Sequence, residues 1–455
     1  MDMDSYFRAL RGKRTAVLGV GISNLPLAQK LLEYGAVVTL HDRKEVLKGK
    51  ALELSRQAFA VCLGAGYLDE IDADVIFRSP GIRPDEAGIL RAVAGGAVLT
   101  SEMEAFFEVC PCPITAVTGS DGKTTTTTLI ALMLERQGKR VHLGGNIGMP
   151  LLCKAGNMSP DDEAVVELSS FQLMTMSVPA HRAVITNLAP NHLDKHRSME
   201  EYVDSKMNIF RGQGPDDLLV LNADNRITAP MAAQAGGRVR MFSRAAPVEE
   251  GCYLDGDSVM FSSGGNAREI FKRKDILLRG DHNTENYMAA AACLMGQVEP
   301  ETMAEVARTF KGVAHRMELI RTLNGVEFYN DSIASSPTRT AAGLSCFGDN
   351  VVLIAGGYDK KIPFDPLGPD ICAHVKQLFL YGPTASAIAG AVERAPGSEK
   401  PKIVMCGNFD EAVLEAAHGA LSGQCVLMSP ACASFDSFNN FEERGERFRQ
   451  LVNGL

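Results

Sequence analysis

The sequence predicts an α/β protein with three domains. Short apolar runs alternate with helical stretches along the whole chain, and several of these runs end in glycine-rich or polar turns. This alternation is typical of parallel sheets, which hold ligands at the carboxyl ends of their strands. With 455 residues, the chain is too long for a single hydrophobic core. We therefore expect domains at residues 1–110, 111–313 and 314–455.

Residues 1–110 are expected to form a Rossmann-like domain. Apolar runs predict strands at 14–20, 36–40, 73–77 and 97–100, with a helix at 25–34 between the first two. The turn after the first strand contains Gly19 and Gly21, and Asp42 ends the second strand, as in a dinucleotide-binding fingerprint. Asn24 stands where that fingerprint has its third glycine. A nicotinamide cofactor and another diphosphate nucleotide both remain compatible with this pattern.

The central segment carries the most specific motif, the seven residues 119–125 (Gly-Ser-Asp-Gly-Lys-Thr-Thr). They follow an apolar run at 114–117 and precede another at 129–134, so a strand leads into a glycine turn and then a helix. Backbone N–H groups and the positive end of the helix then converge where a polyphosphate can bind. Lys123 would reach the terminal phosphates, and the Thr124 hydroxyl would ligate Mg²⁺. The motif predicts a short variant of the P-loop, which binds a nucleoside triphosphate.

Polar residues that follow the P-loop in the chain suggest further parts of the same site. Glu167 ends the apolar run 164–167, which is the expected position of a carboxylate that binds Mg²⁺. His192 lies in a polar turn and could ligate a cation bound to phosphate. Lys206 has the spacing of an ordinary exposed helix residue. Sequence spacing therefore supports Glu167 and His192 but not Lys206.

The C-terminal segment again alternates strands and helices. Strands are predicted at the apolar runs 326–329, 351–355, 378–381, 403–405 and 425–428. Polar or glycine-rich turns that contain Asp331, Lys360 and Ser434 follow three of these strands. Because the carboxyl ends of parallel strands share one edge of a sheet, we expect these residues to lie near a small-molecule site. We interpret Lys360 as an anion-binding lysine.

Composition excludes several other classes of protein. The net charge of −9 comes without basic clusters, so no nucleic-acid partner is expected. The eleven cysteines are scattered, as in a protein with reduced thiols. No apolar run approaches the ~20 residues that cross a bilayer, and the acidic N-terminus lacks a signal region. A cytoplasmic monomer without a membrane partner is expected.

Together, the motifs resemble those of the Mur ligases, the ATP-dependent amino-acid ligases of peptidoglycan precursor synthesis. The resemblance rests on residues 118–125, 167–171, 191–194 and 315–316, and its three-segment order spans the chain. Residues 429–436 and 440–445, together with the turns at 19–23 and 79–81, are similar to the branch that adds D-glutamate. The Asp-Asn-Pro-Arg sequence of the branch that adds diaminopimelate or lysine is absent.

This resemblance implies a role for each matching residue. The ATP-binding residues would be Gly119, Ser120, Asp121, Gly122, Lys123, Thr124, Thr125, Asn286, Arg316 and Asp331. The UDP-sugar would contact Ile22, Ser23, Asp42, Arg43, Gly81 and Asn146. The amino acid would contact Ser335, Lys360, Ser434 and Phe441. Two Mg²⁺ ions would be held by Thr124, Glu167, His192 and Lys206, the last as a carbamylated lysine. Lys123, His192 and Lys206 would be the catalytic residues.

The implied activity is the ATP-dependent addition of D-glutamate to UDP-N-acetylmuramoyl-L-alanine through an acyl phosphate. Three alternatives remain open on sequence grounds. The first is a related ligase, either another Mur ligase or one similar to folylpolyglutamate synthetase. The second is a binding protein switched by a nucleotide at the P-loop. The third is a nicotinamide-dependent dehydrogenase that uses Gly19 and Asp42.

Overall fold

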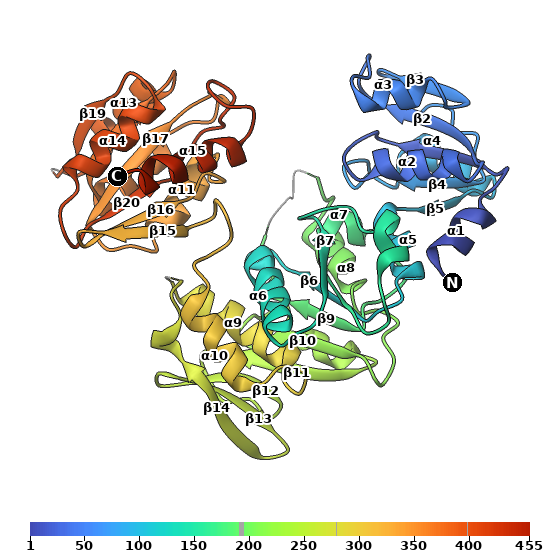
Figure 1. The fold of residues 1–455 in the computed structure, drawn as a ribbon, viewed down its shortest axis with the longest axis horizontal. Helices are drawn as coiled ribbons and strands as arrows, with labels where there is room; N and C mark the ends of the chain where they lie inside the picture. Colours follow the sequence, from blue (N-terminus) through green and yellow to red (C-terminus); the bar gives the residue numbers. More distant parts are fainter. Residues whose placement is uncertain (191–194, 279, 398) are drawn as a thin grey trace. The chain divides into compact units, whose positions relative to one another are not determined.

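The computed structural model describes residues 1–190, 195–278, 280–397 and 399–455. Three sheets follow one another along the chain, with five, nine and six strands (Figure 1). The chain divides into two compact units. The first contains residues 1–275 and 282–308, and the second contains residues 276–281 and 309–455. The predicted α/β class is confirmed, and the first unit holds both the N-terminal and the central sheet.

The N-terminal sheet is wholly parallel and has the strand order β3-β2-β1-β4-β5. Its strands are β1 (Arg14–Leu18), β2 (Val37–Asp42), β3 (Ala60–Leu63), β4 (Val75–Arg78) and β5 (Val98–Thr100). Its helices are α1 (Met3–Ala9), α2 (Asn24–Glu33), α3 (Lys50–Ser55), α4 (Ala87–Ala94) and α5 (Glu102–Val109). The order reverses between β1 and β4, so a crevice is expected where the turns after these two strands diverge. The four predicted strands are confirmed, whereas the short edge strand β3 was not predicted.

The central sheet has the order β14-β13-β12-β11-β10-β9-β6-β8-β7. Its strands are β6 (Ile114–Thr118), β7 (Val141–Gly145), β8 (Glu163–Glu167), β9 (Arg182–Ile185), β10 (Leu218–Asn222), β11 (Arg238–Ser243), β12 (Gly251–Asp255), β13 (Ser258–Ser263) and β14 (Asn266–Lys272). Its helices are α6 (Lys123–Arg136), α7 (Ser170–Leu173), α8 (Met199–Met207), α9 (Asp281–Leu294) and α10 (Pro300–Thr309), with 3₁₀ turns η1 (Leu152–Asn157), η2 (Ala229–Gln234) and η3 (Arg273–Asp275). Strands β6 to β12 pair in parallel, and β13 and β14 add an antiparallel edge.

The C-terminal sheet has the order β15-β16-β20-β17-β18-β19, and it is parallel except for the first pair. Its strands are β15 (Glu318–Leu323), β16 (Val326–Asn330), β17 (Val351–Gly356), β18 (Val375–Tyr381), β19 (Lys402–Met405) and β20 (Cys425–Met428). Its helices are α11 (Pro337–Leu344), α12 (Gly368–His374), α13 (Ala385–Arg394), α14 (Phe409–Gly419) and α15 (Phe441–Asn453), with the 3₁₀ turn η4 (Asp365–Leu367). All five predicted strands are present.

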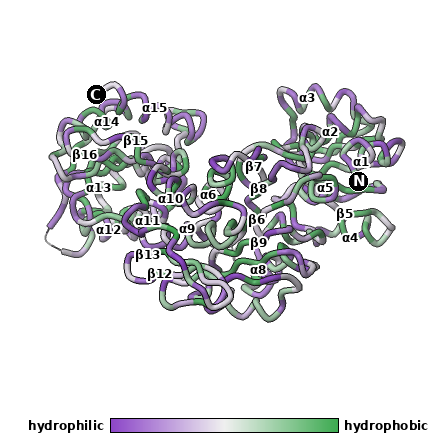
Figure 2. The backbone as a smooth tube through the Cα atoms, turned by 60° about the horizontal axis from the view of Figure 1, so that its bottom comes forward, coloured by the Kyte–Doolittle hydropathy of each residue, from purple (hydrophilic) through white to green (hydrophobic). Residues whose placement is uncertain are grey.

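The central strands form the core of each sheet. Every residue of β6, β8, β9 and β10 is buried, and so is every residue of β17 and β20. Apolar stretches, drawn in green, lie in the region of β6 and β9 in Figure 2. Such continuous apolar strands are expected in parallel sheets that are covered on both faces. Of the helices in the described part of the chain, none combines the length and apolar character that crossing a bilayer requires.

Candidate active site

The predicted P-loop connects β6 to α6, and its backbone requires glycine at two positions. Gly119 and Gly122 have φ values of 151° and 77°, a region that other residues rarely adopt. A Cβ atom on Gly122 would lie 2.2 Å from the Asn286 Oδ1 atom. A Cβ atom on Gly119 would lie 1.9 Å from the Thr186 Oγ1 atom. The loop is therefore packed tightly, and α6 begins directly after it at Lys123.

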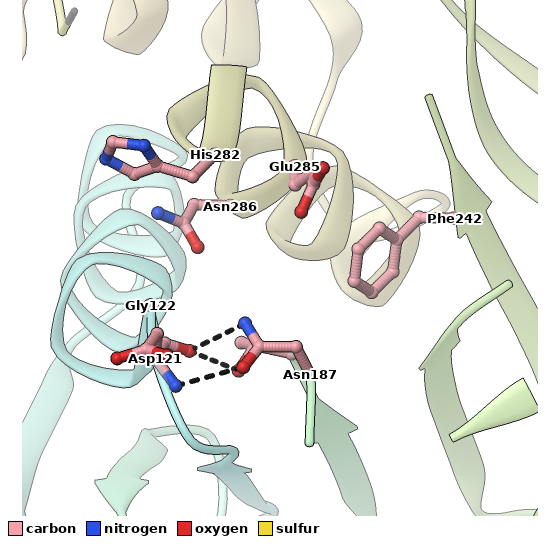
Figure 3. A pocket seen from close by; sticks show the side chains of 8 residues that line it. Asp121, Gly122, Asn187, Phe242, His282, Glu285 and Asn286 are labelled. Atoms are coloured by element: carbon pink, nitrogen blue, oxygen red, sulfur yellow. Dashed lines mark hydrogen bonds between the residues drawn. The ribbon is translucent and has the colours of Figure 1, made fainter. Parts of the chain in front are cut away.

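Side chains from neighbouring elements hold this loop in place. Ser120 Oγ donates to the Ala189 carbonyl at 3.0 Å and lies 2.9 Å from the Tyr202 hydroxyl. The backbone N–H of Asp121 donates to Asn187 Oδ1 at 3.0 Å, and Asn187 Nδ2 donates to the Asp121 carbonyl at 3.2 Å (Figure 3). These bonds fix the backbone that would face a phosphate.

The P-loop lysine and threonines occupy the first turn of α6. Lys123 Nζ donates to the carbonyls of Gly119 and Ser120 at 3.0 and 2.9 Å, so its ammonium group lies over the loop. Thr125 is buried on the same turn. A loop that combines this lysine with a helix N-terminus has the features that bind a polyphosphate.

A pocket lies beside the loop (Figure 3). Its lining residues come from the P-loop, the ends of β9 and β11, and the start of α9: Asp121, Gly122, Thr186, Asn187, Phe242, His282, Glu285 and Asn286. Asn286, predicted to meet the nucleotide, accepts a hydrogen bond from Thr126 Oγ1 at 3.2 Å. The sequence analysis gave no role to five of these residues: Thr186, Asn187, Phe242, His282 and Glu285. The proximity of His282 and Glu285 to Asn286 on one helix could have indicated two of them.

Thr124, in the first turn of α6, lies next to Glu167, which ends β8. Thr124 Oγ1 donates to Glu167 Oε2 at 2.7 Å, and Asn146 Nδ2 donates to Glu167 Oε1 at 2.9 Å. Glu167 is only 2% exposed, which is rare for a carboxylate unless it is paired or binds a cation. Carboxylate, hydroxyl and amide oxygens are the ligands that Mg²⁺ prefers. This set of donors fits one Mg²⁺, and it places Asn146, expected at the UDP-sugar, beside the predicted metal carboxylate.

Lys206 is fully buried next to the same loop. Its Nζ atom donates to Thr118 Oγ1 at 3.0 Å and to the Gly119 carbonyl at 2.9 Å, and it lies 4.9 Å from the Tyr202 ring centre. Burial, together with the nearby charge of Lys123, holds the pKa of Lys206 well below its usual range. The spacing-based interpretation of Lys206 as an exposed lysine is therefore wrong. The other predicted metal ligand, His192, lies outside the described residues.

The N-terminal candidates gather around the turns that follow β1, β2 and β4. A Cβ atom on Gly19 would lie 2.9 Å from Ser79 Cβ, so the turns after β1 and β4 are in contact. Asp42 Oδ2 accepts a hydrogen bond from the Val20 N–H at 2.8 Å, which fixes the glycine turn. The remaining candidates differ in exposure: Ile22 is 83% exposed, Arg43 and Gly81 are exposed, and Ser23 is half-buried. The turns are thus brought together at one edge of the sheet.

The amino-acid candidates gather at the carboxyl edge of the C-terminal sheet. Lys360 Nζ donates to both the carbonyl and the Oγ of Ser335 at 3.1 Å. Burial and the charges of Arg339 and Arg444 lower the pKa of Lys360. Ser434 follows the neighbouring strand β20 and is buried, while Phe441 begins α15 and is half-buried. Several positive charges around one strand edge fit an anionic ligand.

The sequence analysis gave Arg444 no role, yet this residue connects the loop after β16 with the loop after β20 by hydrogen bonds. Its guanidinium group is fully buried and donates to Ser332 Oγ and to the carbonyls of Ser332, Cys432 and Ala433 at 2.9 to 3.2 Å. Ser332 Oγ in turn donates to the Phe441 carbonyl at 2.7 Å. Arg444 therefore links the loop after β16 to the backbone that directly precedes Ser434. Its position inside the 440–445 motif was the available signal.

Asp331 and Arg316 belong to the second compact unit. Asp331 accepts a hydrogen bond from Ser429 Oγ at 2.8 Å, and complete burial raises the pKa of its carboxyl group to about 7. The backbone N–H of Met317, the residue after Arg316, donates to Asp331 Oδ1 at 3.3 Å, so the chain at Arg316 passes beside Asp331. Arg316 precedes β15, and Asp331 follows β16.

A glycine-rich loop between a parallel strand and a helix places this chain among the P-loop proteins. Comparison with known protein families identifies the family within this class. Residues 117–294 match the Mur ligase middle domain, and residues 315–432 match the glutamate ligase domain of Mur ligases. The chain belongs to the Mur ligase family.

Curated relatives cover the full chain. Three are each named UDP-N-acetylmuramoylalanine–D-glutamate ligase. The protein of Acetivibrio thermocellus is 50% identical over 100% of this chain and 99% of its own. That of Ruminiclostridium cellulolyticum is 46% identical with the same coverage. That of Clostridium novyi is 47% identical over 98% of each chain.

Solved structures of other Mur ligases share the fold at low sequence identity. A UDP-N-acetylmuramate-alanine ligase from Thermotoga maritima has a TM-score of 0.58 at 16% identity and covers 97% of this chain and 99% of its own. The MurF ligase of the same organism, in complex with ADP, has a TM-score of 0.54 at 16% identity, with 98% and 97% coverage. These similarities support the fold of the whole chain.

Proposed function

We propose that this protein is an ATP-dependent ligase that joins D-glutamate to UDP-N-acetylmuramoyl-L-alanine during peptidoglycan precursor synthesis. This proposal rests mainly on three relatives that are named for this activity. They are 46% to 50% identical to this chain over 98% or more of its length. The P-loop with its adjoining pocket supports nucleotide use, as does the ADP bound to the MurF relative.

The proposal divides the work among three segments of the chain. Residues 1–110 would bind the UDP-sugar, residues 111–313 would bind ATP, and residues 314–455 would bind D-glutamate. The turns after β1 and β4, the P-loop and the loops around Lys360 support this division. Since each substrate has its own domain, the domains must bring the reacting groups into line.

The chemistry follows from the poor reactivity of a carboxylate. ATP would transfer its terminal phosphoryl group to the carboxylate of the L-alanine residue, which forms an acyl phosphate and releases ADP. The D-glutamate amine would then attack the acyl carbon, and inorganic phosphate would leave. Negative charge rests on phosphate oxygens in both steps, so Lys123 and the N-terminus of α6 would stabilise it electrostatically. No side chain needs to act as a nucleophile.

Magnesium would neutralise charge on the phosphates when it is bound. Thr124 and Glu167 would hold one ion, with Asn146 orienting the carboxylate. We propose that His192 and carbamylated Lys206 would hold a second.

Lys206 is suited to this modification because carbon dioxide reacts with a neutral amine. Burial beside Lys123 favours the neutral form of Lys206. The amine nitrogen would add to the carbon of CO₂ and release one proton, which leaves a carbamate anion. This replaces a positive group with a carboxylate-like one that a cation can accept.

The amino acid would bind between the loops that follow β16, β17 and β20. The Lys360 ammonium would pair with a D-glutamate carboxylate, and Ser335 and Ser434 would supply hydroxyl groups. Ser335 already accepts from Lys360, so the two side chains face the same space. The Phe441 ring would cover an adjacent side.

The deciding experiment measures ADP release with UDP-N-acetylmuramoyl-L-alanine across a panel of D- and L-amino acids. Strong stimulation by D-glutamate is expected, with the other amino acids far weaker. Stimulation by a different amino acid would indicate another ligase of the family. Nucleotide binding without any amino-acid-dependent turnover would indicate a nucleotide-switched binding protein instead.

A further inference from the structure

Two arginines fasten the loop after β4 onto the central domain. This loop comprises residues 79–85 and contains Gly81, which the proposed function assigns to the UDP-sugar. Its contacts with α7 and α8 involve side chains that no part of the proposed mechanism uses. The inference below rests on the proposed function, because it concerns how that substrate is placed relative to ATP.

Arg78 holds the first half of the loop. It ends β4 and is 1% exposed. Its Nη1 atom donates to the Ile82 carbonyl at 2.6 Å, which closes the loop on itself. Its Nη2 atom donates to the carbonyl of Phe171 in α7 at 2.9 Å and to Oγ1 of Thr175, two residues beyond the end of α7, at 3.2 Å. One buried guanidinium group thus binds the loop and the central domain together.

Arg83 holds the second half of the loop. It binds Asp85 in a bidentate way, with nitrogen–oxygen distances of 2.8 and 2.9 Å. The same guanidinium group donates to both carboxylate oxygens of Glu201 on α8, at 2.7 and 3.3 Å. Arg197 also pairs with Asp85, and its backbone N–H donates to Glu201 at 2.7 Å. Planar bidentate pairs of this kind constrain orientation as well as distance.

Both helices lead directly to the ATP site. On α8, Tyr202 follows Glu201 and contacts Ser120 of the P-loop, while Lys206 donates to the Gly119 carbonyl. Helix α7 begins three residues after Glu167. A shift of the loop relative to α7 or α8 would therefore move the UDP-sugar relative to the P-loop and Glu167.

The simpler explanation is that these contacts only stabilise domain packing. Exposed ion pairs contribute little to stability, and Arg83, Asp85 and Glu201 are each about one-quarter exposed. Arg83 also lowers the pKa of Asp85 and of Glu201, because both carboxylates accept hydrogen bonds from its guanidinium group. The contacts converge on one seven-residue loop and on the two helices next to the P-loop. Their arrangement fits control of geometry better than general packing.

We propose that Arg78 and Arg83 are positioning residues that set the UDP-sugar loop against the ATP site, so that the substrate carboxylate meets the terminal phosphate of ATP. They touch neither reacting group. Because the loop belongs to the N-terminal domain and the P-loop to the central domain, each ligand alone should still bind when these contacts are lost. The loss of these contacts should instead lower kcat.

The test compares the full-length parent with Arg83→Ala, Arg83→Lys and Glu201→Gln. We expect Arg83→Ala to lower kcat by roughly 10- to 100-fold, the scale of a misplacement of about 1 Å. The KM for ATP and the calorimetric Kd values for ADP and the UDP-sugar should stay within about threefold of the parent. Arg83→Lys should have a kcat between those of Arg83→Ala and the parent. Its ammonium group keeps the positive charge but cannot bind Asp85 and Glu201 in two bidentate pairs. Combining Arg83→Ala with Glu201→Gln should lower kcat no further than Arg83→Ala alone.

Arg136→Ala is the matched control, because Arg136 pairs with Glu305 between α6 and α10 in the same unit, and both side chains are half exposed. It should leave kcat unchanged. The proposal is overturned if Arg83→Ala and Glu201→Gln both keep kcat within twofold of the parent, or if Arg83→Ala also loses ADP binding. It is equally overturned if Arg136→Ala loses as much activity.

A hydrogen-exchange readout separates this inference from the proposed function. In the parent, bound ADP should slow exchange at residues 79–85 through α7 and α8, and Arg83→Ala should abolish this effect. If the parent shows no turnover with D-glutamate but retains the exchange effect, the proposed function fails, whereas the coupling of this loop to the ATP site through α7 and α8 stands. If ADP leaves exchange in the parent loop unchanged, the positioning role is refuted whatever the turnover.

Discussion

At the scale of single residues, the proposed site contains ionisable side chains whose burial disfavours their charged form. Lys206 lies in a buried space where an ammonium group is unfavourable, yet it is anchored by two hydrogen bonds. Buried ionisable groups of this kind concentrate at functional sites. The neutral amine can react with CO₂, whereas an exposed lysine stays protonated at neutral pH.

Lys206→Ala should therefore lose most activity and regain part of it when short carboxylic acids are added. Such acids can supply the oxygen ligands that a carbamate would have provided. Turnover is measured with and without acetate or propionate, and ¹³C NMR after incubation with labelled bicarbonate tests the carbamate directly. If the fully active parent shows no ¹³C carbamate signal after this incubation, Lys206 is not carbamylated.

Two adjacent lysines provide a matched test of the amino-acid site. Lys360 points to Ser335, whereas Lys361 has φ of 60° and pairs with Asp359 at 2.8 Å. Lys360→Ala should raise the KM for D-glutamate by roughly 10- to 150-fold, the cost of one charge-assisted hydrogen bond. The KM for ATP should change far less, and Lys361→Ala should change neither. A D-glutamate saturation curve for Lys360→Ala that overlays the parent curve would refute the assignment.

At the scale of elements, the strand, turn and helix that form the P-loop act as one unit. The Lys123 side chain is held over the turn by two carbonyls at the N-terminus of α6. Lys123→Ala should leave the fold intact and reduce turnover by at least ~10²-fold, the scale for loss of one preorganised donor. Steady-state kinetics and circular dichroism measure both effects, and near-normal turnover in a folded variant would exclude the P-loop assignment.

Helix α5 carries a buried carboxyl group that should make stability depend on pH. Glu102 accepts a hydrogen bond from the Leu152 N–H at 2.9 Å, and burial raises its pKa to about 7. Between its ordinary pKa and about 7, the folded protein binds more protons than the unfolded chain. The stability contributed by Glu102 is therefore present at low pH and is lost as pH rises through about 7.

Glu102→Gln keeps the hydrogen-bond acceptor but cannot ionise. The free energy of unfolding of the variant relative to the parent should rise between pH 4.5 and 7, by up to roughly 3 kcal/mol. Denaturant titrations over this range measure the difference, and Glu305→Gln on the exposed side of α10 is the control. A difference that stays constant with pH would show that Glu102 does not titrate in this way.

The sequence predicted those elements whose signal is local. The P-loop could be identified because its strand, glycines and helix are contiguous, and the buried strands are continuous apolar runs. The antiparallel strands β13 and β14 gave no such signal, since residues 266–269 of β14 are exposed. The depth of Lys206 and the four loop contacts of Arg444 depend on packing between distant segments. Spacing along the chain carries no information about such contacts.

At the scale of the whole molecule, the chain has two compact units with separate cores. The first holds the P-loop and its pocket, and the second holds Lys360 and the loops around it. A ligand that binds only the folded form of one unit stabilises that unit by an amount set by its concentration and Kd, about 2.7 kcal/mol at 100 times Kd. The two units should therefore respond differently to the two ligands.

Calorimetry should resolve two unfolding transitions, one for each unit. ADP should raise the transition of the first unit, and Lys123→Ala should abolish most of this rise because the phosphates lose their cation. D-glutamate should raise the transition of the second unit, and Lys360→Ala should remove that rise while Lys361→Ala retains it. Assignment of each transition comes from hydrogen exchange within β6 and β17, which lie at the centres of the two cores. A single transition that both ligands shift equally would mean that the two units unfold as one, which contradicts their separate cores.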